Sequence, residues 1–148
     1  MSARPHPAVA ATLARWHAMI ERGDLAELPA LVKDDAVFRS PMARKPYPVR
    51  EAVVFILCTV FGVFENFAYH RELVADDGLN VVLEFSAEVN GRQLKGVDLI
   101  RFDDDGRIVD FEVMVRPMSG LAALGDEMSR RVAHVLPTLQ QGAGGSGA

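Results

Sequence analysis

The segment LKGVDLIRFDDDGRIVDFEVMVRP, residues 94–117, predicts the centre of a β-sheet. Asp105-Gly106 closes a tight turn, because glycine adopts positive φ without steric strain. After the turn, apolar residues recur at every second position, which is the period of a strand with one face on a core. We therefore predict a hairpin whose second strand turns four side chains inward: Val109, Phe111, Val113 and Val115.

The strand before the turn is apolar on both faces, which is typical of a central strand covered on both sides. Val97 and Leu99 lie on one face, and Ile100 and Phe102 lie on the other together with Asp98. Burying an unpaired carboxylate costs several kcal/mol, and protonation is the usual relief. We predict that Asp98 is largely buried with a raised pKa. The alternatives are a structural partner or a position that reaches solvent.

The composition bounds the class of protein. The 148 residues suffice for one domain, and the net charge of −4 without a basic patch argues against nucleic acid and membrane partners. The apolar run 52–64 is too short to span a bilayer, which needs about 20 residues. Its single cysteine, Cys58, is predicted to be buried. We expect one cytoplasmic domain, residues 1–137, and a disordered Gly/Ser/Ala-rich tail, residues 138–148.

Helical periodicity and turn residues predict the elements around the hairpin. They are a helix from Val9 to Gly23, a second helix from Asp24 to Val32, a short strand 36–38, an apolar helix 49–64, strands 67–74 and 79–89, and a last helix 119–135. Helices segregated from an antiparallel sheet define the α+β class. We expect the helices to cover the apolar sheet face and to leave a cone-shaped cavity.

Three motifs, in this order, resemble the NTF2-like superfamily and its SnoaL-like group. They are Gly23-Asp24-Leu25, residues 34–38 followed by Ser40-Pro41, and residues 96–102 followed by 105–108. The resemblance implies a cone-shaped, curved antiparallel sheet wrapped by helices into an α+β barrel, here with an extra C-terminal helix. It also implies an apolar pocket and commonly a homodimer. The superfamily includes isomerases, dehydratases, polyketide cyclases, epoxide hydrolases and non-enzymes, so the fold alone does not define the chemistry.

Within this superfamily, ketosteroid isomerase offers a comparison of sites. Asp98 resembles its protonated oxyanion-hole aspartate, Trp16 replaces its tyrosine, and Ser40 replaces its general-base aspartate. Trp16 can donate one hydrogen bond, whereas Ser40 needs an activator to act as a base. The epoxide hydrolases need a second acid where this chain has apolar residues. The chain is more similar to SnoaL-type cyclases, which rely on one acid/base aspartate over an apolar pocket.

Two classes of function follow for a small, mostly apolar organic ligand. In the first, a cofactor-independent isomerase, cyclase or dehydratase uses Asp98 to move a proton beside a carbonyl. His70 is then the second catalytic candidate, although a half-exposed histidine at the sheet edge is the favoured alternative. In the second, a non-catalytic ligand-binding or protein-interaction domain uses Asp98 to hold a polar group. The candidate ligand-binding residues are Trp16, Ser40, Ile100, Phe102, Phe111, Val113 and Val115.

The remaining expectations concern metals and partners. No His, Cys and carboxylate cluster has the spacing of metal ligands, so we expect neither a metal nor a cofactor. Apolar residues on the side of the sheet away from the pocket predict a homodimer interface there. They are Val82, Val97, Leu99 and Met114.

Overall fold

A computed structural model of the chain describes residues 3–133. In chain order its elements are α1 (Pro7–Arg22), the 3-10 helix η1 (Leu28–Leu31), β1 (Val32–Arg39), β2 (Tyr47–Pro48), α2 (Arg50–Val63), β3 (Glu65–Val74), β4 (Asn80–Val89), β5 (Arg92–Phe102), β6 (Ile108–Arg116) and α3 (Met118–Val132). The helices predicted at 49–64 and 119–135 and the meander of long strands are therefore present within a few residues of their predicted bounds.

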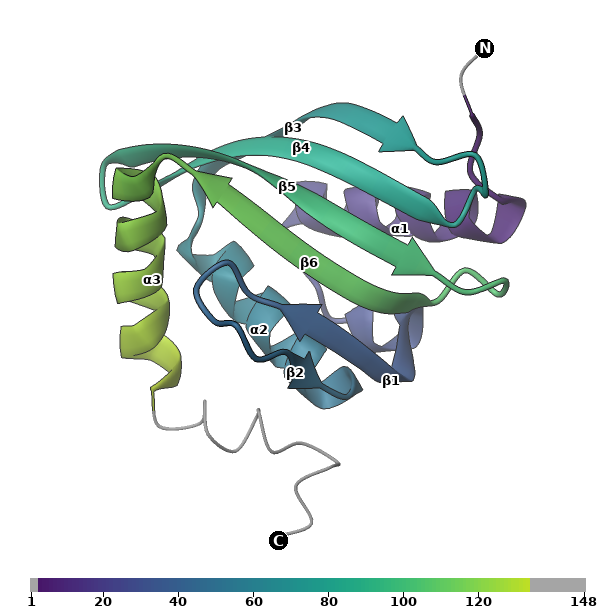
Figure 1. Ribbon diagram of the computed structural model, residues 1–148, viewed down its shortest axis with the longest axis horizontal. Helices are drawn as coiled ribbons and strands as arrows, with labels where there is room; N and C mark the ends of the chain where they lie inside the picture. The colour runs from purple at the N-terminus through teal and green to yellow at the C-terminus, as the bar shows by residue number, and fades with distance from the viewer. Residues whose placement is uncertain (1–2, 134–148) are drawn as a thin grey trace, which may run out of the picture.

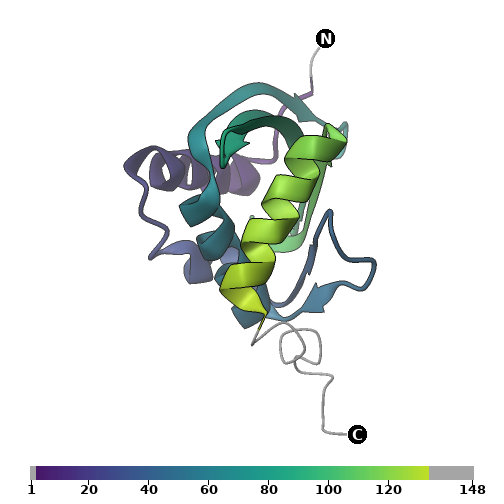
Figure 2. The ribbon, with the colours of Figure 1, turned by 90° about the vertical axis from the view of Figure 1, so that its left-hand side faces the viewer.

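The strands form one sheet in the order β2-β1-β6-β5-β4-β3. Strands β3 to β6 are an antiparallel meander, as predicted, and β5 is central. β1 pairs with β6 in parallel, so the sheet is mixed and not antiparallel throughout. A parallel pair needs a long connection, which α2 and the meander supply here. The sheet is curved and is not closed into a barrel (Figures 1 and 2). The predicted NTF2-like α+β fold with a C-terminal helix is confirmed.

The helices enclose one face of the sheet. In Figure 1, α1 lies behind the meander, α2 lies behind β1 and β2, and α3 stands across the end of the meander. α3 contacts β4, β5, β6 and α2, and it buries Leu124 and Val132. The last helix is therefore docked on the domain, as its leucine stripe predicts. The predicted tail, residues 138–148, lies outside the described residues.

The predicted second helix does not form. The Asp24 carboxylate accepts a hydrogen bond from the Ala26 N–H at 3.0 Å, which closes a local turn, and Pro29 has no N–H to donate. Only η1 follows, and its period of three turns Leu28 and Leu31 into the core. β1 then begins at Val32 and is longer than predicted.

Two details of the central hairpin and α2 also differ from prediction. A register irregularity after Arg101 pairs Phe102 with Ile108, so Ile108 is buried where Val109 was expected. The predicted turn is present, and Gly106 has φ +81° with the Ala8 carbonyl against it, which leaves no room for a side chain. Cys58 is exposed and not buried, because the side of α2 that carries it faces solvent.

Candidate active site

The candidate site is built around the Asp98 carboxyl on the inner face of β5. Asp98 is 3% exposed and lies between Leu83 of β4 and Val113 of β6. The predicted burial on the covered face is therefore confirmed. The Tyr69 hydroxyl donates a hydrogen bond to Asp98 Oδ2 at 2.6 Å. Trp16 Nε1 in turn donates to the Tyr69 oxygen at 3.0 Å. One chain of hydrogen bonds thus connects α1, β3 and β5.

Burial controls the titration of both members of the Tyr69–Asp98 pair. Desolvation raises the pKa of Asp98 to about 7, and the hydrogen bond from Tyr69 opposes part of this rise. Burial, and then the charge of Asp98, raise the pKa of Tyr69 well above its ordinary value, so its hydroxyl stays protonated. Within residues 3–133, no ion pair compensates Asp98. The carboxyl therefore has a neutral donor as its partner and can exist in either protonation state near neutral pH.

Asp98 opens onto a mostly apolar cavity of about 90 Å³. Aliphatic and aromatic side chains of β1, α2 and α3 form most of its wall. Four residues of the wall carry polar side chains: Ser40, Tyr47, Asp98 and Ser129. Of these, Asp98 is the one acid, and no basic side chain lines the cavity. The described residues also contain no group of three or more His, Cys, Asp or Glu side chains that could hold a metal ion.

A second, larger hollow of about 750 Å³ lies between α1, α2 and β3. It is more open to solvent than the cavity beside Asp98. Phe61 and Phe64 line both spaces, and Tyr69 lines the larger hollow, whereas Asp98 lines the cavity alone. We take the smaller cavity as the candidate site, because it contains the buried titratable group.

The structure brings only part of the predicted ligand-binding set to this cavity. Ser40 and Val113 line it with Asp98. Trp16 and Phe111 are buried behind it, where their ring centroids lie 5.6 Å apart. The other three predicted residues do not line the cavity either: Ile100 and Phe102 are buried in the core, and Val115 is half-buried near the end of β6. On the central hairpin, only the paired residues Asp98 and Val113 line the cavity. The alternating pattern of the strands therefore predicted more lining residues than the structure has.

His70, the second catalytic candidate, does not reach the cavity, and the alternative of an exposed histidine agrees with the structure. His70 is exposed, and its Nε2 lies 2.7 Å from Ser86 Oγ on the outer face of the sheet. Neighbouring residues of a strand point to opposite faces, so His70 points outward where Tyr69 points inward. Tyr69 takes the place expected for His70. The alternation of Phe67 and Tyr69 along the strand was a usable signal for an inward Tyr69. Tyr47 carried no such signal, because it lies in a short segment between the predicted strand 36–38 and the predicted helix 49–64.

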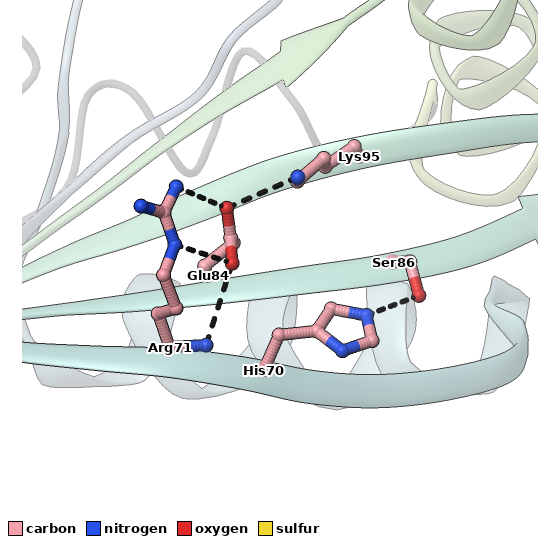
Figure 3. A network of polar contacts seen from close by, with 5 residues as sticks. All are labelled: His70, Arg71, Glu84, Ser86 and Lys95. Atoms are coloured by element: carbon pink, nitrogen blue, oxygen red, sulfur yellow. Dashed lines mark hydrogen bonds and ion pairs between the residues drawn. The ribbon is translucent and has the colours of Figure 1, made fainter.

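A second carboxylate of low exposure lies on the outer face. Glu84 accepts hydrogen bonds from Arg71 Nε and Nη2 at 3.0 and 2.7 Å, and Lys95 Nζ lies 3.1 Å away (Figure 3). The side chain is 9% exposed, because the two basic side chains cover it at the surface of the sheet. Their hydrogen bonds and charges lower the pKa of Glu84 to about 2. This carboxylate is therefore ionised at every physiological pH.

Comparisons with known proteins agree with this architecture. The sequence profile of the SnoaL-like domain matches residues 13–111. A crystal structure of a steroid delta-isomerase from Pseudomonas aeruginosa is 64% identical, covers 92% of this chain and 99% of that chain, and has a TM-score of 0.87. An uncharacterized protein with a cystatin-like fold from Silicibacter pomeroyi DSS-3 is 36% identical, covers 89% and 92% of the two chains, and has a TM-score of 0.78.

The chain therefore belongs to the SnoaL-like family, within the NTF2-like superfamily. The epoxide hydrolase/cyclase-like enzyme SalBIII of salinomycin pyran ring formation is 17% identical over 75% of this chain and 92% of that chain. Its TM-score of 0.61 shows a shared fold alone. A comparison with curated proteins found no significant match. No helix within residues 3–133 has the length and apolar character needed to cross a membrane.

Proposed function

We propose that this protein is a cofactor-independent enzyme that binds a small, mostly apolar carbonyl compound and moves a proton with Asp98. The observation that carries the proposal is the Asp98 carboxyl, buried beside an apolar cavity with a neutral hydroxyl as its hydrogen-bond donor. A pKa of about 7 suits a group that must both take and return a proton near neutral pH. The relative described as a steroid delta-isomerase supports isomerisation among the candidate reactions.

The proposed step is redox-neutral. The Asp98 carboxylate takes a proton from the carbon next to the carbonyl, and the C–H electron pair forms the enolate. The same carboxyl then returns the proton, to another carbon in an isomerisation. Tyr69 positions the carboxyl through Oδ2, and Oδ1, which has no hydrogen bond among the described residues, is the oxygen that we assign to proton transfer. Cyclisation and dehydration of carbonyl compounds can begin with the same proton removal.

The size of the cavity limits the ligand. Pockets for drug-sized ligands have volumes of about 300–1,000 Å³, and an apolar cavity of about 150 Å³ accepts benzene. The cavity here has a volume of about 90 Å³, so even a monocyclic ligand requires some movement of its wall and a steroid requires much more. Met42 and Met128 are the flexible side chains of that wall. We therefore favour a monocyclic or short-chain carbonyl compound over a steroid.

Deuterium exchange tests the proton-removal step. Cyclopentanone in D₂O should exchange its α-hydrogens faster with the protein than with buffer, as followed by proton NMR. Asp98→Asn should abolish the acceleration, because the amide cannot take the proton. Glu84→Gln is the matched control, since it removes a carboxylate of low exposure from the opposite face. Equal acceleration by wild type and Asp98→Asn would refute the assignment.

The second candidate is a non-catalytic ligand-binding or protein-interaction domain. The small cavity and the absence of a second charged group from its wall favour this alternative. In that case Asp98 holds a polar group of the ligand. Retention of binding without any α-hydrogen exchange would support this candidate.

We also propose that the protein is a cytoplasmic homodimer that associates through the outer sheet face. Leu99 and Met114 are 37% and 50% exposed, and Leu73 on β3 is 55% exposed. Val82 pairs with Leu99, and Val97 pairs with Met114, so these side chains form one patch across four strands. Sedimentation of wild type at micromolar concentration should give a dimer, and Leu99→Lys should give a monomer. A monomeric wild type contradicts the proposal.

A further inference from the structure

Tyr47 is a second polar group in the cavity, and it comes from the short edge strand β2. It pairs with Phe38 of β1, is 5% exposed, and lines the same cavity as Asp98. Its hydroxyl has no hydrogen-bond partner within residues 3–133. The chain has two tyrosines, and the other one, Tyr69, uses its hydroxyl both as donor and as acceptor.

The Tyr47 hydroxyl must reach open space. Among the described residues, no side-chain nitrogen or oxygen that is sealed from solvent lacks a hydrogen-bond partner. The unpartnered Tyr47 oxygen therefore keeps accessible surface, and the residue lines the cavity together with Asp98. A hydroxyl that has little accessible surface and no partner in the described protein can bind a ligand that supplies an acceptor.

The chemistry of the group defines what it can bind. Burial raises the pKa of Tyr47, so the phenol keeps its proton and can donate one hydrogen bond. Asp98, in contrast, is the acid/base group of the same wall. A donor and a proton acceptor that share an otherwise apolar wall fit a ligand with one carbonyl oxygen and an acidic C–H next to it.

We infer that Tyr47 donates a hydrogen bond to the carbonyl oxygen of a small apolar ketone or aldehyde whose α-carbon faces Asp98. The inference rests on the proposed function and adds the residue that recognises the oxygen. As Asp98 removes the proton, negative charge develops on that oxygen, and a hydrogen bond to a charged acceptor is roughly twice as strong as a neutral one. Tyr47 would thus contribute more to the enolate than to the bound ketone, which is the requirement for catalysis.

Paired probes of equal shape test the inference. Cyclopentanone carries the acceptor oxygen, and methylenecyclopentane replaces it with a CH₂ group. Tyr47→Phe should weaken cyclopentanone binding about fivefold, the effect of one net hydrogen bond, and should leave methylenecyclopentane binding unchanged. The carbonyl carbon resonance of ¹³C-labelled cyclopentanone should move toward its position in an apolar solvent. α-Hydrogen exchange should slow by about tenfold or more, because the charged acceptor loses a stronger bond.

Tyr69→Phe is the matched control, because it removes the other tyrosine hydroxyl. It should shift the pH midpoint of exchange upward by removing a donor to the Asp98 carboxylate, whereas Tyr47→Phe should leave that midpoint in place. Equal weakening of both probes by Tyr47→Phe, or no change in either, overturns the role of Tyr47 and leaves the proposed function standing. Failure of wild type to bind either probe or to accelerate exchange overturns the proposed function as well. Unfolding curves of each variant identify loss of fold.

Discussion

Two carboxylates of low exposure lie on neighbouring strands and opposite faces of one sheet, and their pKa values move in opposite directions. Asp98 of β5 faces the cavity, and its pKa rises to about 7. Glu84 of β4 faces outward, and its pKa falls to about 2. Both side chains have little exposed surface. Low exposure therefore does not by itself determine how a carboxyl titrates.

The partners of the two carboxyls explain the difference. Glu84 lies at the surface beneath Arg71 and Lys95, whose cationic groups favour its ionised form. Asp98 lies in the core, and the neutral hydroxyl of Tyr69 offsets only part of its lost hydration. The outer face thus holds the permanent negative charge of Glu84 within a polar network. The inner face holds Asp98, which can gain or lose a proton near neutral pH. We therefore place the proposed acid/base chemistry on the inner face.

Removing the cover of the inner face should have the largest effect. A chain ending at Pro117 lacks α3 and therefore loses the buried side chains of Leu124 and Val132. Burial of each such apolar side chain stabilises the fold by roughly 1.5–3 kcal/mol. The free energy of unfolding should fall by several kcal/mol, and the pKa of Asp98 should drop as water enters. A chain ending at Ala133 is the control, because it keeps α3. Denaturant titration and carboxyl NMR measure both quantities, and an unchanged melting temperature would contradict the docking of α3.

Asp98→Asn should abolish the unusual pH dependence of stability. The folded state binds the Asp98 proton more tightly than the unfolded state does, so its contribution to stability is fully present below the ordinary aspartate pKa of 3.8 and is lost as pH rises through about 7. This loss is on the order of 4 kcal/mol, from about 1.4 kcal/mol per pH unit. Denaturant unfolding from pH 4 to pH 8 should show that the free energy of unfolding of Asp98→Asn rises relative to that of wild type. Parallel curves would show that Asp98 titrates normally.

Tyr69→Phe should remove the one donor to Asp98 without removing the ring. The lost hydrogen bond lowers the free energy of unfolding by roughly 1–3 kcal/mol, and it leaves Trp16 Nε1 without its acceptor. The pKa of Asp98 should rise further, which increases the contrast with Glu84. A carboxyl NMR titration at the Asp98 resonance checks this direction. A lower pKa in Tyr69→Phe would mean that water or another group replaces the hydroxyl.

Glu84→Gln should have the smallest effect and the opposite pH dependence. The folded pKa of Glu84 is lowered, so its contribution to stability is present above the ordinary glutamate pKa of 4.5 and is lost as pH falls toward about 2. The variant should be less stable than wild type at pH 7, by less than Tyr69→Phe, and the difference should shrink with added salt because the ion pairs are at the surface. Melting temperatures at low and high salt measure it. A salt-independent loss would place the network in the core.

The sequence predicts the sheet well because alternation reports directly which face each residue occupies. All five inward residues of β4 are buried: Val81, Leu83, Phe85, Ala87 and Val89. The burial of Asp98 follows from the same rule. The parallel pairing of β1 with β6 could not be predicted in this way, since it depends on contacts between segments far apart in the chain.

The candidate site was only partly predictable, for related reasons. Asp98 interrupts an apolar pattern, and Tyr69 continues one, so both carry a signal. Tyr47 lies in a strand of two residues, which is too short to show a period. The extent of the cavity along β5 and β6 depends on the curvature of the sheet and on how α2 and α3 pack, and neither is encoded in the alternation of one strand.

The hydrogen bond from Trp16 to Tyr69 has a spectroscopic consequence. Trp16 is the only tryptophan of the chain, and it is 1% exposed. Its indole donates to the same oxygen that donates to Asp98, so ionisation of the carboxyl polarises that oxygen and strengthens its bond to the indole. The emission wavelength and lifetime of this single tryptophan should therefore report the protonation of a group two hydrogen bonds away. A ligand that changes the protonation of Asp98 can then be followed optically without any label.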